Sequence, residues 1–81
     1  MKKSSSYYIP GHDLSKREWE VIRLIVEEKT TSEIADELFV SKHTIETHRK
    51  NILSKLPVRN VVGVVKFALN EWAKNEYAQT A

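Results

Sequence analysis

The sequence contains no cysteine and only two glycines and two prolines among its 81 residues. Without thiols, the chain can form neither a disulfide framework nor a thiolate metal site. This is typical of proteins in the reducing cytoplasm, where we expect this one to act. No apolar run is long enough to span a bilayer, so we expect no membrane partner. The basic start MKK is not followed by the hydrophobic segment that a signal peptide requires.

Catalytic patterns are also missing. A chain of 81 residues forms one small domain, which leaves no room for a cleft between two domains. The isolated Gly11 and Gly63 cannot form a glycine-rich phosphate loop. His43 and His48 stand five positions apart, so in a helix they point to different faces and cannot share a metal ion as an i, i+4 pair could. We therefore expect no enzyme, no cofactor and no metal.

The net charge is only +2, but the charges are unevenly distributed along the chain. Between residues 17 and 40, seven acidic residues stand against three basic ones, whereas between residues 41 and 60 five basic residues stand against one acidic residue. A surface that binds DNA phosphates needs such a concentration of positive charge, because the release of counterions drives much of the binding. Residues 41–60 are therefore the better candidate for contact with a nucleic acid.

The segment TSEIADELFVSKHTIETHRKNILSKL, residues 31–56, has the pattern of a helix, a short turn and a second helix. Thr30 and Glu33 have the spacing of a capping box, and Ser41 stands where the N-cap of the second helix belongs. Only a few residues between Leu38 and Ser41 connect the two helices. This spacing is typical of a helix-turn-helix, in which the second helix enters the major groove of DNA.

The second helix separates apolar from polar side chains. Ile45, Ile52 and Leu56 form its apolar stripe, and Arg49 is expected to cover the edge of the core. The opposite face carries groups that can pair with base edges, although a merely solvated face would also be polar. We expect base contacts from Glu46, Thr47 and Lys50, with His43 and Asn51 as outer candidates, and phosphate contacts from Thr31, Ser41, Lys42, Thr44, His48 and Lys55.

The stretch LSKREWEVIRLIVEEKTTSEIADELFVSKHTIETHRKNILSKLPV resembles the LuxR-type, or GerE-type, DNA-binding domain. The family pattern is roughly L-[ST]-x-R-E-x-E-V, [TS]-x-x-E-I-A, V-S-x-x-T-[VI]-x-x-H and K-L-x-V. The matching residues are Leu14, Ser15, Arg17, Glu18, Glu20 and Val21, then Thr30, Glu33, Ile34 and Ala35, then Val40, Ser41, Thr44, Ile45 and His48, and finally Lys55, Leu56 and Val58.

The resemblance covers about residues 14–69 and implies an all-α fold of four helices. In such a domain a tri-helical core binds double-stranded DNA and a C-terminal helix forms a homodimer, in the service of bacterial transcription regulation. These domains usually follow a sensor or receiver domain, as in the response regulators of two-component systems, and sometimes stand alone. RNA polymerase is a further partner that such a regulator implies.

The chain departs from the family pattern at Lys29 and Pro57, where glycine is common, and at Val61, where arginine is common. Lys29 lacks the ease with which glycine adopts the left-handed conformation at a helix end, whereas Pro57 suits a helix stop. The run VVGVVKFAL could form a strand on its β-branched content alone. The family pattern and the helical period of the following apolar residues favour a helix, with Asn60 as its N-cap.

This last helix is apolar around more than one face. The resemblance assigns the dimer contact to it, and we expect that contact to include Val62, Lys66 and Leu69. The alternative is that Tyr7 and Tyr8 cover the same stripe within one chain.

The expected organisation is a flexible lead or linker at residues 1–13, the DNA-binding domain at 14–76 and a tail at 77–81. Ser15 and Glu18 form a further capping box, which starts the first helix. The helices are expected at about 16–28, 32–39, 42–56 and 60–75. Two other interpretations stay open: a promoter-binding module like region 4 of sigma factors, and a helical protein-interaction module that does not bind DNA.

Overall fold

The structure, a computed structural model, describes residues 7–80, and the side chains of residues 7–75. It is all-helical, and the described residues contain no strand, which confirms the expected fold class. The helices are α1 (Lys16–Val26), α2 (Thr31–Leu38), α3 (Lys42–Lys55) and α4 (Val61–Thr80).

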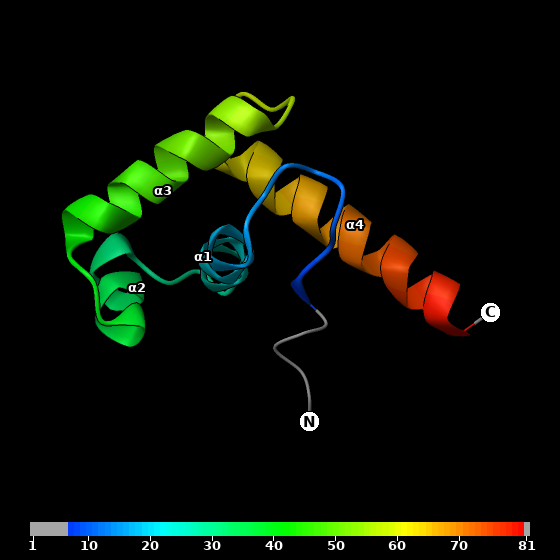
Figure 1. The fold of residues 1–81 in the computed structure, drawn as a ribbon, viewed down its shortest axis with the longest axis horizontal. Coiled ribbons are helices and arrows are strands. Elements are labelled where there is room, and N and C mark those ends of the chain that lie inside the picture. The colour runs from blue at the N-terminus through cyan, green and yellow to red at the C-terminus, as the bar shows by residue number, and fades with distance from the viewer. Residues whose placement is uncertain (1–6, 81) are drawn as a thin grey trace.

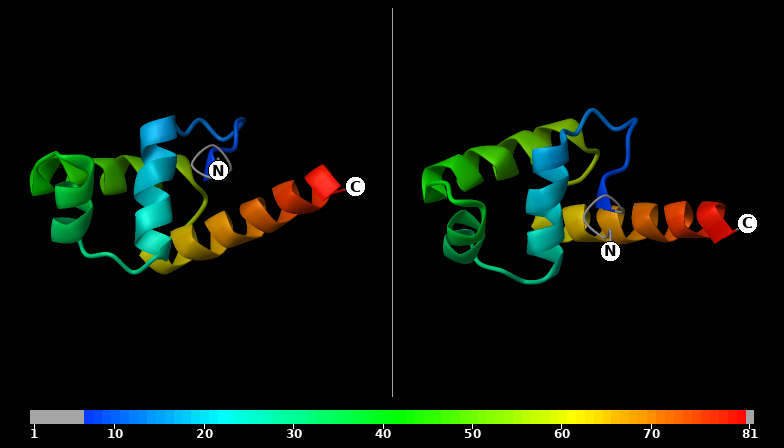
Figure 2. Two further views of the ribbon diagram at one scale, coloured as in Figure 1. Left: turned by 90° about the horizontal axis from the view of Figure 1, so that it is seen from below. Right: turned by 60° about the horizontal axis from the view of Figure 1, so that its bottom comes forward.

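Helix α1 lies at the centre of the molecule, where Figure 1 shows it end-on. Helices α2 and α3 pack against each other on one side of it, and α4 passes on the other side. In both views of Figure 2 the C-terminal half of α4 extends beyond the other three helices. Because α3 packs against α1 and α2 on its inner side only, its outer side is left open.

Side-chain caps begin all four helices at the expected residues. Ser15 and Thr30 each accept a hydrogen bond from the backbone of the third helical residue, and the glutamate at that position accepts one in return. The Ser41 hydroxyl accepts from the Thr44 backbone N–H at 3.1 Å, and the Asn60 side chain accepts from that of Gly63 at 3.2 Å. These bonds satisfy N–H groups that have no partner within the helix, so they fix where each helix begins.

Helix α1 ends earlier than the expected residue 28. The backbone N–H groups of Glu28 and Lys29 bond back to Ile25 and Leu24, at 2.9 and 3.0 Å, and Glu28 adopts the left-handed conformation with φ of 66°. This is a Schellman closure, in which one residue must be left-handed. The left-handed residue is therefore Glu28. Lys29, where glycine is common in the family, does not adopt a positive φ, so it does not carry the backbone strain that the sequence suggested.

Helix α4 continues to Thr80 instead of ending near residue 75. No glycine or proline follows Asn75, so the sequence provides no signal that would stop the helix there. The backbone of residues 77–80, expected to belong to a tail, forms the last turn of the helix.

The core lies around α1. Trp19, Ile22 and Leu24 are fully buried, and the other helices add apolar side chains from each direction. The further fully buried members are Val21, Ile34, Ile45, Ile52, Val64 and Ala68. Burial of this apolar surface is the main force that holds α3 in place.

Residues 7–13, which fall within the expected lead, pack against α1 and α4. The Trp19 indole N–H donates to the Ile9 carbonyl at 3.1 Å, and the Trp72 indole N–H donates to the Tyr7 carbonyl at 2.9 Å. The rings of Tyr7 and Trp72 meet edge to face, with centroids 5.3 Å apart. Residues 1–6 of the expected lead lie outside the described residues.

Candidate nucleic-acid interface

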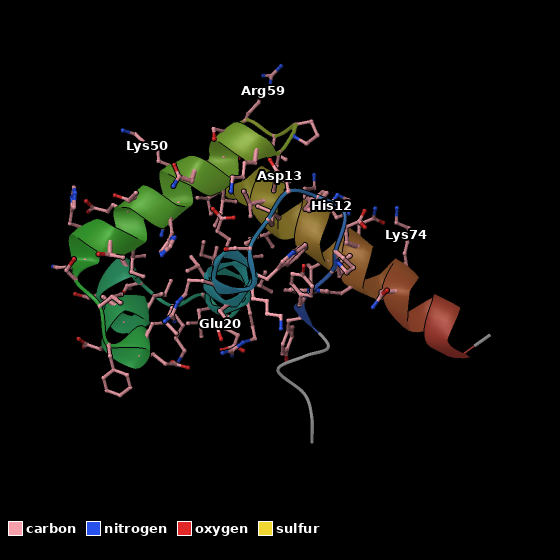
Figure 3. The ribbon with its side chains drawn as sticks, in the orientation of Figure 1. His12, Asp13, Glu20, Lys50, Arg59 and Lys74 are labelled. Atoms are coloured by element: carbon pink, nitrogen blue, oxygen red, sulfur yellow. The ribbon has the colours of Figure 1, made fainter. Side chains whose placement is uncertain are left out.

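The base-reading residues expected from the sequence lie together on the outer face of α3. All five of them are exposed, while Ile45 and Ile52 on the inner face are buried at 0% and 1% exposure. Figure 3 shows Lys50 pointing outward, away from α1. The exposed group consists of His43, Glu46, Thr47, Lys50 and Asn51. Because the helix is anchored on one side only, these side chains are available to a ligand on the other.

The N-terminal end of α3 is ordered by Ser41 and Thr44. Their hydroxyl oxygens lie 3.0 Å apart, and the Ser41 hydroxyl also accepts the Thr44 backbone N–H. Lys42 between them is exposed. The first turn of a helix has backbone N–H groups and a partial positive charge directed outward, so this end of α3 suits a phosphate group.

Thr31 and Arg49 connect α3 to the start of α2. The Arg49 guanidinium donates to the Thr31 hydroxyl at 3.3 Å, and both residues are half-buried. Arg49 therefore covers the edge of the core, as its place on the helix predicted, and in addition holds the two helices of the motif together. The Thr31 hydroxyl is an acceptor in this bond and can still donate to a phosphate.

The C-terminal end of α3 is tied to α1 by an ion pair. The Lys55 ammonium lies 2.9 and 3.0 Å from the two carboxylate oxygens of Glu18, which is only 4% exposed. Burial would raise the pKa of Glu18. The backbone N–H of Ser15, the Lys55 ammonium and His48 outweigh it and hold the pKa below the ordinary value. Lys55, expected to contact phosphate, thus has a buried partner within its own chain.

Arg59 was not among the DNA contacts expected from the sequence. It lies in the loop between α3 and α4, is exposed, and in Figure 3 points outward on the same side of the molecule as Lys50. The sequence signal for it was its place in the basic stretch of residues 41–60, two positions after the helix stop at Pro57.

Apart from Glu46, the acidic residues whose side chains are described lie outside α3, and some of them are paired with cations there. Arg23 of α1 pairs with Glu27 at 3.1 Å and, across to α2, with Glu37 at 3.9 Å. By contrast, Lys42, Lys50 and Arg59 take part in no ion pair among the residues whose side chains are described. The unpaired positive charge of the basic stretch is therefore concentrated on and beside α3.

A second exposed surface follows α4. Val62 and Leu69 are 65% and 52% exposed, and Lys66 between them is exposed as well. Phe67 is instead covered, because it packs against His12 and Trp19. The alternative that Tyr7 and Tyr8 cover Val62 and Leu69 within one chain is thus wrong, since both side chains stay open.

No group of three or more potential metal ligands occurs in the described part of the chain. None of the helices in that part combines the length and apolar character needed to cross a membrane.

The short turn, the buried inner stripe and the open polar face of α3 define a DNA-binding helix-turn-helix domain of the kind that regulates transcription. Residues 12–68 match the family described as bacterial regulatory proteins, luxR family. The chain belongs to this family, as the four sequence blocks predicted. The match favours this class over the sigma-factor module that the sequence left open.

Several regulators are similar to this chain. It is 44% identical over 68 residues to the uncharacterized response regulatory protein YgeK of Escherichia coli, a match that covers 84% of this chain and 46% of that protein. It is 47% identical over 58 residues to the transcriptional regulatory protein LiaR of Bacillus subtilis, covering 72% of this chain and 28% of LiaR.

The spore germination protein GerE of Bacillus subtilis is 52% identical over 46 residues, covering 57% of this chain and 62% of GerE. The chain thus spans less than two thirds of the length of each of these relatives. No solved structure matches the chain.

Proposed function

We propose that the protein binds double-stranded DNA sequence-specifically, with α3 in the major groove. The observation that carries this proposal is that five side chains able to reach base edges are exposed on one face of a helix whose other face is buried. The major groove admits one α-helix and presents a distinct pattern of donors and acceptors for each base pair. Lys50 on this face, with Lys42 and Arg59 beside it, takes part in no ion pair among the described side chains, and these cations supply the attraction to phosphates.

The side chains divide into two roles. Lys50 can donate to guanine and Glu46 can accept from the cytosine amino group, with Thr47, His43 and Asn51 around them. Ser41, Lys42 and Thr44 at the start of α3, together with Thr31 and His48 at its flanks, are placed for phosphates. The phosphate contacts would orient the helix and the base contacts would select the sequence.

We further propose a two-fold dimer through α4. Val62, Lys66 and Leu69 are spaced as one face of a helix, and all three are exposed. Two linked copies bind two half-sites about one helical turn apart, which raises the affinity above that of one small domain. The dimer contact is tested by sedimentation velocity on Leu69→Glu, with Asn70→Glu, an exposed neighbour, as the matched control. We expect only the first variant to dissociate, and an unchanged mass in both would refute this face.

The similarity to regulators suggests the setting in which this domain works. We propose that this domain works together with a preceding receiver or sensor domain, because the similar protein YgeK is described as a response regulatory protein. RNA polymerase would be the partner at a promoter, and the cytoplasm the place of action.

The test of DNA reading is a binding selection on random duplex DNA with the wild type, Lys50→Ala and Glu46→Ala. We expect the wild type to enrich one motif. Lys50→Ala should weaken binding and flatten its salt dependence, and Glu46→Ala should relax the base preference at one position by about 1–3 kcal/mol. If the wild type enriches no motif, or neither variant differs from it, α3 is not the reading helix.

A further inference from the structure

Two cations lie near the C-terminal end of α3, and the structure gives them different surroundings. Lys55 is the last residue of the helix, and its side chain is about one-third exposed, at 32%, with both ammonium contacts directed to Glu18. Arg59 lies four positions later in the loop, exposed and outside every ion pair among residues 7–75. The two charges are close in sequence but are not equally available to DNA.

Glu18 is well placed to hold the end of α3. Its carboxylate accepts the Ser15 backbone N–H at 2.9 Å, as part of the cap of α1, and the same oxygen accepts the Lys55 ammonium. The cap of α1, the central helix, therefore holds the Glu18 carboxylate independently of its contact with α3. A buried carboxylate that loses its cation is left with an uncompensated charge, so the pair favours one position of α3 relative to α1.

Arg59 is held in place by the packing of its loop. Its neighbour Val58 is half-buried and lies against Gly63 in the first turn of α4, where a β-carbon added to the glycine would come within 2.8 Å of the Val58 β-carbon. Asn60 on the other side of Arg59 caps α4. A cation on a loop that is fixed on both sides loses little backbone entropy when it contacts a phosphate, so the cost is that of ordering its side chain.

We propose that Arg59 makes the phosphate contact at the C-terminal end of the reading helix, whereas Lys55 is a positioning residue that fixes α3 through Glu18. This assignment rests on the proposed function and deepens it, because it extends the DNA surface from α3 into the α3–α4 loop. It also replaces the phosphate contact that the sequence predicted for Lys55 with a positioning role.

The salt dependence of DNA binding separates the two roles. Each phosphate contact adds about 0.9 to the slope of log affinity against log salt. With two protomers bound, Arg59→Ala should lower the slope by about 1.8, so between 50 and 200 mM KCl the wild type loses about 12-fold more affinity than the variant. Lys55→Met should weaken binding at every salt concentration with the slope unchanged, and Lys55→Arg should restore the affinity because it keeps the ion pair.

Arg17→Ala is the matched control for Arg59→Ala. It removes one positive charge from an exposed arginine that pairs with Glu20. Figure 3 shows Glu20 on the side of α1 away from α3. We expect its slope to equal that of the wild type. The probe for all variants is the duplex recovered by selection, or a 24-base-pair random duplex if no motif is enriched.

Glu18→Gln tests the positioning role from the other partner. Glutamine can still accept the Ser15 N–H in the capping box, but the charge that holds Lys55 is lost. The variant gains one unit of positive charge, so general electrostatics predict tighter DNA binding, whereas loss of positioning predicts weaker binding. Glu20→Gln makes the same change in charge at an exposed position of α1 and should not weaken binding.

The results separate this assignment from the proposed function. A lower slope for Arg59→Ala, together with weaker binding by Glu18→Gln, supports the assignment. A wild-type slope for Arg59→Ala, a lower slope for Lys55→Met, or tighter binding by Glu18→Gln overturns it while leaving DNA binding intact. A wild type without salt-dependent DNA binding overturns both.

Discussion

Gly63 lies where the start of α4 approaches the preceding loop most closely, and its replacement by alanine gives a defined prediction. An alanine β-carbon would lie 2.8 Å from the Val58 β-carbon and 3.3 Å from its Cγ1. The nearest atom belongs to the base of a β-branched side chain, so it can move only with the backbone. Such overpacking costs about 1–3 kcal/mol.

Alanine also has a higher helix propensity than glycine, which offsets up to about 1 kcal/mol of this cost. We therefore expect Gly63→Ala to lower the free energy of unfolding by about 1 kcal/mol, which corresponds to a decrease of about 4–8 °C in Tm for a domain of this size. Thermal and urea unfolding followed by circular dichroism measure it, with Asn70→Ala at an exposed position of the same helix as control. A Gly63→Ala variant as stable as the wild type would refute the close-contact argument.

Three further predictions concern the other contacts that hold the domain together. The pKa of Glu18 is lowered in the folded state, so its contribution to stability is complete above the ordinary value of 4.5 and is lost as the pH falls through the lower value of the folded state. Between pH 5 and about pH 3, the free energy of unfolding measured with urea should therefore decrease less in Glu18→Gln than in the wild type. Trp72→Phe removes the donor to the Tyr7 carbonyl but keeps an aromatic ring, and should lower the free energy of unfolding by about 0.5–1.5 kcal/mol; an unchanged urea midpoint would argue against that bond. Ser41→Ala removes the cap of α3 and should cost about 1 kcal/mol, whereas Ser32→Ala, at an exposed position of α2, should cost much less in the same assay.

The sequence predicted the helix starts because each depends on residues only three positions apart. Ser15 with Glu18, and Thr30 with Glu33, form capping boxes that can be recognised without any tertiary contact. The inner and outer faces of α3 could be predicted for the same reason, since the period of the helix assigns them.

The contacts that orient the helices could not be predicted in this way. The bond from Lys55 to Glu18 joins residues 37 positions apart, and the bond from Trp72 to Tyr7 joins residues 65 positions apart. Such pairs depend on how α1, α3 and α4 pack, which no local pattern contains. For this reason Lys55 was expected to contact DNA, and residues 1–13 were expected to be a flexible lead or linker.

The helix ends were less predictable because the left-handed positions are not glycines. Glu28 and Phe39 adopt φ of 66° and 60°, a conformation that is uncommon for such residues. In both cases the following backbone N–H closes the helix, from Lys29 to Leu24 and from Val40 to Ala35, each at 3.0 Å. These bonds and the packing of the next segment outweigh the local preference.

Methylation interference on the selected duplex tests most directly whether the exposed face of α3 reads the major groove. Dimethyl sulfate methylates guanine at N7 in the major groove and adenine at N3 in the minor groove. We predict that N7 methylation blocks binding at guanines in both half-sites, and that Lys50→Ala loses this sensitivity at one guanine of each half-site. Interference confined to adenine N3, or an identical guanine pattern in wild type and Lys50→Ala, would contradict major-groove reading by this face.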